Sequence, residues 1–203
     1  SPRLKKSLPR YLSLDESIQL LEAVDEPNQA RDYCILTLFL NCGLRISELV
    51  SLNITDVREE QLRVLGKGNK ERMIFLNEAC RAALDDWLEE RSRQAAADPN
   101  ALFLTRTHTR MTKDAVHYMV KQRLKKAGLD ASLYSSHKLR HTAATLMLQN
   151  GVDVRTLQEV LGHENLNTTQ IYTHVDNENL RSAAKANPLG RMKKKSTPIP
   201  PGK

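Results

Sequence analysis

The chain has 203 residues, 40% of them hydrophobic, which is enough for one large domain or two small ones with a substantial core. Its 31 lysines and arginines outnumber 24 acidic residues, giving a formal net charge of +7. No run of about 18 apolar residues is present, and residues 1–10 lack the apolar centre of a signal peptide, so neither a membrane-spanning helix nor a secretory leader is predicted. Three cysteines without framework spacing (Cys34, Cys42 and Cys80) are expected to be reduced and buried.

The net positive charge of the chain comes from its two ends. Residues 1–10 and 191–203 contain basic residues and no acidic residue, so the middle of the chain is close to neutral. The net charge is therefore weak evidence for a nucleic-acid partner. A stronger signal is segment 106–126, in which seven Lys or Arg accompany one acid, Asp114. We expect this segment either to contact phosphates or to form an ordinary solvated surface.

Residues 1–12 are predicted to form a basic arm or linker, followed by a helix that Ser13 begins. Ser13 and Glu16 form a capping box, in which the serine oxygen and the glutamate carboxylate satisfy free backbone N–H groups. Residues 29–41 are apolar nearly all round and are predicted to form the central core helix. Gly43 suits the left-handed conformation that ends such a helix.

A short helix is predicted from about Ile46 to Leu52. Arg45 and Glu48 lie three residues apart and therefore on one side of it. A solvated surface ion pair explains the two residues in isolation. The alternative is that Arg45, which directly follows a helix end, is aimed at a fixed ligand.

A β-hairpin is predicted next, with strands over residues 62–65 and 72–76 and a tight turn at Gly68. Lys67 lies in the link between two glycines, where it is either a solvated turn residue or a group that approaches a backbone such as DNA. A short strand over residues 101–105 is a possible third member of this sheet.

The remaining helices are expected to cover residues 77–93, 113–127, 136–149, 154–161, 168–172 and 177–186. The helix over 113–127 and the loop before it present polar groups that could contact a groove or phosphates. These candidates for DNA binding are Arg106, Arg110, Lys113, His117 and Lys121. Residues 188–203 are basic and rich in proline, and we expect a disordered tail there.

The stretch from His137 to Tyr172 contains more polar groups than helix packing needs. Cleavage of a phosphodiester without a metal requires cations that hold the phosphate oxygens, for which Arg45 and Arg140 are candidates because a guanidinium binds phosphate through two parallel hydrogen bonds. A tyrosine can attack phosphorus when a base takes its proton, which suggests Tyr172 with His137. Lys67 could deliver a proton to the leaving oxygen.

Two further histidines accompany this stretch. His163 could hold a phosphate oxygen or support the tyrosine. His141 follows His137 by four residues, a spacing that can bind zinc, but Lys138 occupies the position where a zinc protease has glutamate. We therefore interpret His141 as a hydrogen-bonded helix residue and predict no metal and no cofactor.

Four motifs appear together in the order of a known family: GLRISEL, GKGNKER, HKLRH and LGHENLNTTQIYTHV, at residues 43–49, 66–72, 137–141 and 161–175. Through them the chain resembles the catalytic domain of tyrosine recombinases, the phage-integrase and Xer group. The resemblance covers nearly all of residues 10–185. It implies an α+β, mainly α-helical catalytic domain over residues 13–187, with a small antiparallel three-stranded sheet.

The resemblance also implies a role for each motif residue. Arg45 and Arg140 would clamp the scissile phosphate, and Lys67 would be the general acid for the leaving 5′-hydroxyl. His137 would be the general acid/base, His163 would bind phosphate and Tyr172 would be the nucleophile. Glu48 would support Arg45. The product would be a 3′-phosphotyrosyl bond that keeps the bond energy.

The same resemblance implies double-stranded DNA as the partner, a homotetramer assembled on two DNA sites, a monomer without DNA, and the cytoplasm of a prokaryote, with the nucleoid, as the location. Members of the family carry an N-terminal helical domain that closes around DNA, so the chain is expected to be a catalytic fragment with weak site-specific binding. The C-terminal helix could dock on a neighbouring subunit or pack within its own chain.

Two other functions use similar residues: a type IB topoisomerase-like nicking-closing enzyme and a non-catalytic DNA-binding module. The sequence also does not separate a resolvase of chromosome dimers from a mobile-element integrase, because both would use the same constellation.

Overall fold

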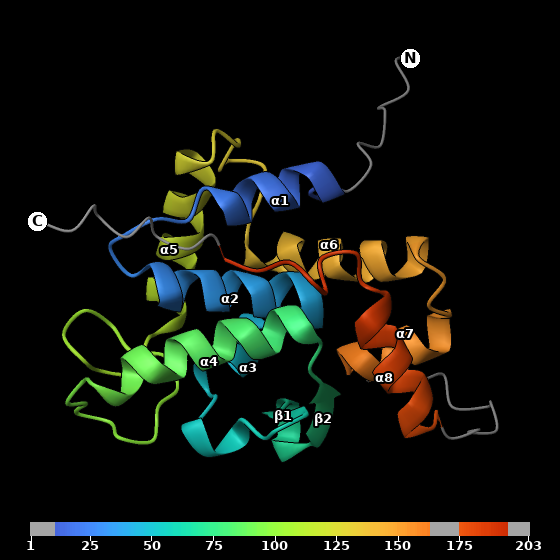
Figure 1. Cartoon of the computed structure of the whole chain (residues 1–203), viewed down its shortest axis with the longest axis horizontal. Helices are drawn as coiled ribbons and strands as arrows, with labels where there is room; N and C mark the ends of the chain where they lie inside the picture. Colours follow the sequence, from blue (N-terminus) through green and yellow to red (C-terminus); the bar gives the residue numbers. More distant parts are fainter. Residues whose placement is uncertain (1–10, 163–174, 195–203) are drawn as a thin grey trace, which may run out of the picture.

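The computed structural model describes residues 11–162 and 175–194, and these residues form a mainly helical domain (Figure 1). The α-helices are α1 (Leu14–Glu22), α2 (Gln29–Cys42), α3 (Ile46–Val50), α4 (Glu78–Ser92), α5 (Lys113–Lys126), α6 (Ser136–Gln149), α7 (Val154–Leu161) and α8 (Asn177–Ala186). The strands and short 3-10 helices are β1 (Gln61–Leu65), β2 (Glu71–Phe75), η1 (Ile54–Asp56) and η2 (Lys67–Asn69). The prediction of a mainly α-helical domain with a small antiparallel sheet is therefore confirmed.

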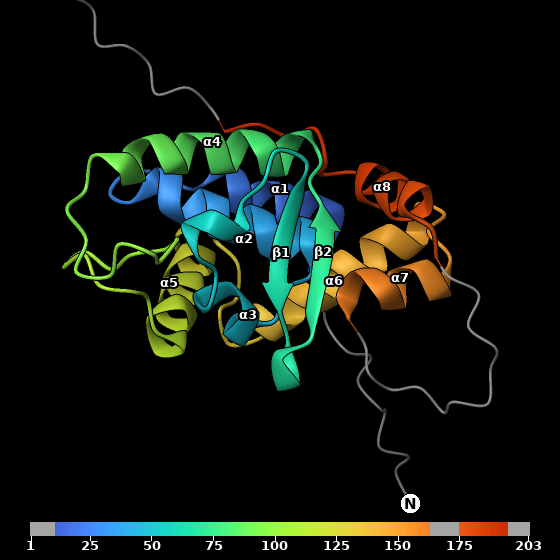
Figure 2. The ribbon, with the colours of Figure 1, turned by 90° about the horizontal axis from the view of Figure 1, so that it is seen from below.

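The predicted central helix, α2, lies at the centre of the molecule, with α1, α4, α5 and α6 around it (Figures 1 and 2). All its residues are buried, which is what a helix that is apolar nearly all round requires. Its side chains join those of the surrounding helices in the main core, to which Trp87 of α4 and Leu139 of α6 also belong. The three cysteines are free and buried, as predicted.

Local sequence signals set the helix ends. The Ser13 hydroxyl accepts a hydrogen bond from the Glu16 N–H at 3.0 Å, and the Glu16 carboxylate accepts one from the Ser13 N–H, also at 3.0 Å. This is the predicted capping box, and it satisfies two backbone donors that α1 leaves without a helical partner. The side chains of Asn77, Thr112 and Asp153 accept backbone N–H groups at the starts of α4, α5 and α7 in the same way.

Gly43 joins the ends of two helices that are far apart in the sequence. Its φ of +63° gives α2 the left-handed end that was predicted, a conformation that favours glycine. A Cβ atom at this position would lie 2.4 Å from Leu161 Cδ2. The end of α2 therefore lies close to the end of α7, and a side chain at residue 43 would require Leu161 to shift.

Within the described residues the sheet has two strands, so the predicted third strand over residues 101–105 is wrong. β1 and β2 pair antiparallel, with Gln61 opposite Phe75 and Leu65 opposite Glu71. Within segment 101–105, only Ala101 and Leu104 form isolated bridges, to different partners. The segment bends to bury its apolar side chains in the core, so it cannot run along an edge of the hairpin.

The C-terminal segment also differs from expectation. Residues 188–194, which we assigned to a disordered tail, cross α2 and α4 in an ordered path (Figure 1). Leu189 is buried, the Ala79 N–H donates to the Gly190 carbonyl at 2.8 Å, and Asn187 Nδ2 donates to the Leu40 carbonyl at 3.0 Å. An apolar anchor and paired backbone groups therefore hold the segment in place, and α8 packs against α7 of its own chain.

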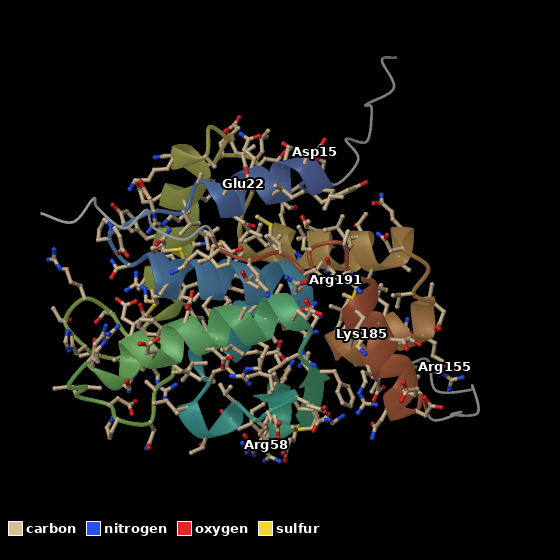
Figure 3. All side chains as sticks on the ribbon, in the orientation of Figure 1. Asp15, Glu22, Arg58, Arg155, Lys185 and Arg191 are labelled. Atoms are coloured by element: carbon tan, nitrogen blue, oxygen red, sulfur yellow. The ribbon has the colours of Figure 1, made fainter. Side chains whose placement is uncertain are left out.

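Charged side chains such as Asp15, Glu22, Arg58 and Arg155 lie at the periphery of the domain (Figure 3). Among the residues that the structure describes, none of the helices combines the length and the apolar character needed to cross a bilayer.

Candidate active site

The candidate residues come from three separate parts of the chain. Arg45 directly precedes α3, Lys67 lies in the turn η2 between the two strands, and His137 and Arg140 lie one turn apart on α6. The fold brings these parts together around one buried carboxylate, that of Glu48.

Glu48 is 2% exposed, so it is not a member of a solvated surface pair. Its Oε1 accepts a hydrogen bond from the Arg45 backbone N–H at 2.8 Å, and its Oε2 lies 3.8 Å from Arg45 Nη1. The Arg45 side chain remains 40% exposed. The carboxylate thus fixes the start of α3 and orients Arg45, while the guanidinium keeps an open side on which an anion could bind.

Sequence reasoning missed Arg72, although it lies in the GKGNKER motif. Its Nη2 donates to Glu48 Oε1 at 3.2 Å, its Nη1 forms a close ion pair with Glu48 Oε2, and its Nε donates to the Val160 carbonyl at 3.2 Å. Arg72 therefore ties β2 to both α3 and the end of α7. The only signal for this role in the sequence was a basic residue with a strand position, which also fits a solvated side chain.

Arg140 is buried at the junction between α2 and α7. Its Nη1 donates to the Gly43 carbonyl and its Nη2 donates to the Leu161 carbonyl at 3.0 Å. Burial is the largest cause that lowers the pKa of Arg140 to about 10; the positive charges of Arg45 and Arg72 also lower it, while Glu48 raises it. Among the described residues, this cluster holds the guanidinium groups of Arg45, Arg72 and Arg140 and the carboxylate of Glu48, an arrangement that attracts an anion.

Lys67 is exposed in the turn next to this cluster. A Cβ atom at Gly66, the residue before it, would lie 3.5 Å from Glu48 Oε2, and the Gly66 N–H donates to the Lys70 carbonyl at 2.8 Å. Gly68, where a tight turn was predicted, has a positive φ of +73°. The hairpin thus brings the start of the lysine turn against the carboxylate that holds Arg45.

His137 and His141 form a close pair on the exposed side of α6. Their Nε2 atoms are 3.2 Å apart and their rings meet edge to face. Burial lowers the pKa of His141, and the neighbouring His137 lowers it further. At this distance one ring can donate an N–H hydrogen bond to the other. No cluster of three metal-type side chains occurs within residues 11–162 and 175–194.

Two members of the predicted set, His163 and Tyr172, lie outside the described residues. Their sequence positions place them after α7 and before α8. Their roles therefore stay predictions.

The predicted DNA-binding residues divide into two groups. Arg106, Lys113 and His117 are exposed. Arg110 instead donates to Asp98 Oδ2 at 3.1 Å, to the carbonyls of Val50 and Leu52 at 2.8 and 3.0 Å, and to Asn53. Lys121 Nζ donates to the carbonyl of Ala131. Arg110 and Lys121 are thus occupied within the protein, which leaves the first group available to a ligand.

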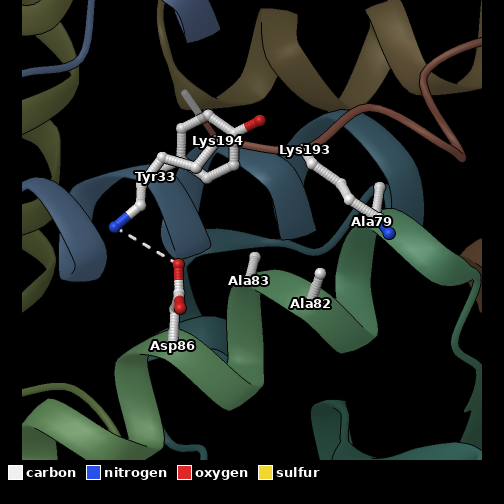
Figure 4. Close-up of a pocket in the computed structure, with 7 residues that line it drawn as sticks. All are labelled: Tyr33, Ala79, Ala82, Ala83, Asp86, Lys193 and Lys194. Atoms are coloured by element: carbon white, nitrogen blue, oxygen red, sulfur yellow. Dashed lines mark ion pairs between the residues drawn. The ribbon is translucent and has the colours of Figure 1, made fainter. Parts of the chain in front are cut away.

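A hollow of about 370 Å³ lies between α2, α4 and residues 193–194 (Figure 4). None of its lining residues belongs to the charged cluster around Glu48. Tyr33, three alanines of α4 and a Lys194–Asp86 ion pair of 3.2 Å line it. Burial raises the pKa of Tyr33 to about 12, and its hydroxyl has no hydrogen-bond partner in the described structure. The hollow is therefore separate from the groups that point to phosphate chemistry.

Comparison with known proteins gives the same family as the motifs. A model of the phage integrase family matches residues 10–179. The tyrosine recombinase XerC of Caldanaerobacter subterraneus subsp. tengcongensis is 54% identical over 192 residues, which cover 94% of this chain and 54% of the relative. The tyrosine recombinase XerC of Vibrio cholerae serotype O1 is 42% identical over 202 residues, covering 96% of this chain and 64% of the relative.

Solved structures of recombinases are also similar to this chain. The XerA recombinase is 36% identical with a TM-score of 0.74, over 91% of this chain and 65% of that chain. The XerH site-specific recombinase, solved in a pre-cleavage complex with its difH substrate, is 31% identical with a TM-score of 0.69, over 88% of this chain and 55% of that chain. The present chain thus spans somewhat more than half the length of the proteins it matches.

Proposed function

The chain belongs to the phage integrase family, and from that membership we propose that it cleaves and rejoins DNA strands at specific sites through a 3′-phosphotyrosyl intermediate. The observation that carries the proposal is the cluster in which Glu48 links Arg45, Arg72 and the start of the Lys67 turn, with Arg140 close enough for its pKa to respond to these charges. The names of the relatives, tyrosine recombinase XerC, support the same activity.

The arginines would supply electrostatic stabilisation. During attack on phosphorus, negative charge grows on the non-bridging oxygens, and preorganised guanidinium groups stabilise it without reorganising. Arg45 has the exposed face for direct contact with the phosphate. Arg140 would contribute its charge from the junction of α2 and α7, with His163 as a further phosphate ligand.

Proton transfers would complete the reaction. His137, on the exposed side of α6, would accept the proton of the Tyr172 hydroxyl as that oxygen attacks phosphorus. Lys67 would donate a proton to the departing 5′-oxygen, so that a neutral hydroxyl leaves. A new 5′-hydroxyl would then attack the phosphotyrosine and restore the phosphodiester. Because the linkage keeps the bond energy, the reaction needs no ATP, metal or cofactor.

The partner in this proposal is double-stranded DNA, and the active assembly is a homotetramer on two sites that forms from monomers. The XerH structure contains its DNA substrate, and another structure with the same fold is a lambda integrase tetramer bound to a Holliday junction. The location would be the cytoplasm of a prokaryote, in association with the nucleoid. The biological role would be chromosome-dimer resolution or the integration of a mobile element.

Trapping of the covalent intermediate tests the proposal and does not require the target sequence to be identified beforehand. The chain is incubated with a pool of nicked duplexes of randomised sequence, so that the short 5′-hydroxyl strand diffuses away after cleavage. We expect a denaturant-resistant protein–DNA adduct with the wild-type chain and none with Tyr172→Phe, and sequencing of the trapped DNA gives the site. No adduct with wild type, even with the full-length protein on its own site, would instead favour a non-catalytic DNA-binding module.

A second measurement separates a recombinase from a nicking-closing enzyme. Two duplexes that carry the recovered site are supplied together, with the strands of each labelled differently. Exchange of labels between duplexes is the result expected for the proposed function. Relaxation of supercoiled DNA without exchange would identify a topoisomerase-like activity.

A further inference from the structure

We propose that Arg72 is a positioning residue. It would fix Arg45 and Arg140, which together form the phosphate clamp, in position relative to each other. It contacts Glu48, which orients Arg45, and it contacts the end of α7, where Arg140 is also bound. This inference rests on the proposed DNA-cleaving function, because that function supplies the phosphate that the clamp would hold.

The contact with Glu48 is bidentate. Nη1 and Nη2 of Arg72 face the two carboxylate oxygens, and both side chains are largely buried, at 16% and 2% exposure. The same Oε1 atom accepts the Arg45 backbone N–H. Removal of Arg72 therefore releases the carboxylate that fixes the conformation of the Arg45 backbone.

The third donor of the same guanidinium serves α7. Arg72 Nε donates to the Val160 carbonyl at 3.2 Å, and a Cβ atom at Gly162 would lie 3.0 Å from Arg72 Cδ, Nε and Cζ. The adjacent carbonyl, that of Leu161, accepts a hydrogen bond from Arg140. Arg72 thus bridges the helix that orients one arginine of the clamp and the helix end that holds the other.

Only arginine has the geometry for all three contacts. Its planar fork presents two parallel donors to a carboxylate and a third donor, Nε, at the base of the fork. A lysine would keep the positive charge, but a single ammonium cannot satisfy both carboxylate oxygens and a helix carbonyl in different directions. Arg72→Lys is therefore expected to retain folding and to lose alignment of the clamp.

The first test measures cleavage of the recovered DNA site by Arg72→Lys. We expect the affinity for the intact site to stay at the wild-type value and the single-turnover cleavage rate to fall by about 100-fold, which is the effect of a misplaced reacting group. Arg63→Met is the matched control. Arg63 lies on the partner strand, bonds to Glu71 and Asp56 and does not touch Glu48, so its loss should leave cleavage unchanged.

A second variant separates positioning from stability. Arg72→Met alone leaves Glu48 as a buried charge without its bidentate partner and can weaken the fold. The double variant Arg72→Met/Glu48→Gln removes both charges, and glutamine can still accept the Arg45 N–H. We expect its unfolding midpoint to return toward wild type while cleavage stays impaired. Recovery of cleavage together with stability would show that Arg72 only supports the fold.

A substrate with sulfur at the leaving 5′-position assigns the defect to the clamp. A thiolate leaves without a proton, so this substrate should restore cleavage by Lys67→Ala, whose missing group is the general acid. It should not restore Arg72→Lys, because the phosphate clamp is still misaligned. Wild-type cleavage by Arg72→Lys, or its rescue by sulfur, would overturn the inference. If the wild-type protein itself formed no covalent adduct, the proposed function would be overturned instead.

Discussion

At the scale of the residue, the Glu48 carboxylate has charged partners on two sides and almost no contact with solvent. A buried carboxylate keeps its charge only when hydrogen bonds and cations replace its hydration. Glu48→Gln preserves the shape of the side chain and removes the charge. We expect the free energy of unfolding to fall by about 1–3 kcal/mol, because the bidentate contact with Arg72 loses its charge-assisted character.

Urea unfolding with an unchanged m-value checks this prediction. The control is Asp85→Asn, since Asp85 forms an ion pair with Arg81 at 2.6 Å on α4 but is 64% exposed. Such exposed pairs contribute about 1 kcal/mol or less. Equal losses in the two variants would mean that burial of Glu48 does not strengthen its contacts.

The histidine pair on α6 gives a prediction with a definite sign. Burial, followed by the neighbouring His137, lowers the pKa of His141 from its usual value of 6.5. The folded chain therefore binds fewer protons at this group than the unfolded chain. Its contribution to stability is present above pH 6.5 and is lost as the pH falls through the lower folded pKa.

An NMR titration of the imidazole resonances measures this shift directly. In the wild-type chain, His141 should titrate below 6.5. In His137→Asn the pKa of His141 should rise, but not fully to the usual value, because burial is the larger cause. An unchanged titration in the variant would show that the two rings do not interact in solution.

At the scale of the element, the end of α7 shows how a glycine can serve two purposes. Gly162 has a φ of +67°, and a Cβ atom there would meet the Arg72 guanidinium at 3.0 Å. Gly151 also has a positive φ, +91°, but its Cβ position has open space around it. Both alanine variants should lose about 1–2 kcal/mol from the left-handed backbone. Gly162→Ala should lose more, because it also displaces Arg72.

The difference between the two glycine variants is the measurable quantity. It isolates the displacement of Arg72, since the backbone cost is common to both. Thermal or urea unfolding gives the stability difference, and the DNA-cleavage assay should show a defect in Gly162→Ala alone. Equal stability in the two variants would mean that Arg72 moves aside at no cost.

The elements that the sequence predicts well are those whose signals are local. The Ser13–Glu16 capping box, the left-handed Gly43 and the turn at Gly68 each depend on residues within one turn of the chain, and each is present as predicted. The third strand failed for the opposite reason. An apolar run over residues 101–105 fits a buried strand or a bent core segment equally well, and only tertiary contacts choose between them.

The residues of the candidate site also differ in whether a local sequence signal indicates them. Motif resemblance selected Arg45, Lys67 and Arg140, but it did not select Arg72. The partners of Arg72 lie 24 and 88 residues away in the sequence, and no local pattern indicates either contact. Arg140 likewise finds its carbonyl partners 97 and 21 residues away. Contacts of this kind depend on how elements far apart in the sequence pack together, which local sequence patterns do not indicate.

At the scale of the whole molecule, the fold brings together two parts of a site that are distant in the sequence. The end of α2 at Gly43 lies close to the end of α7, and Arg140 bonds to both ends. The hairpin of β1 and β2 lies beside α3 (Figure 2), and the start of the Lys67 turn, at Gly66, lies against the Glu48 carboxylate. DNA bound to this site would also reach α5 if Arg106, Lys113 and His117 contact its backbone.

The salt dependence of DNA affinity tests that extended surface. Each phosphate contact contributes about 0.9 to the slope of log affinity against log salt concentration on duplex DNA. Arg106→Ala and Lys113→Ala should therefore each reduce the slope by about 1 and weaken binding without changing stability. Arg110→Ala should leave the slope unchanged, because its guanidinium bonds to Asp98 and to carbonyls of the segment after α3.

The stability measurement completes the comparison between these variants. Arg110→Ala should lower the free energy of unfolding by about 2 kcal/mol or more, since several acceptors lose their donor. Fluorescence anisotropy at a series of salt concentrations gives the slopes, and urea unfolding gives the stabilities. Arg110→Ala could instead reduce the slope as much as Lys113→Ala and leave stability intact. That result would mean that Arg110 leaves its internal partners to bind phosphate. The division of these cations into ligand-binding and internal groups would then be wrong.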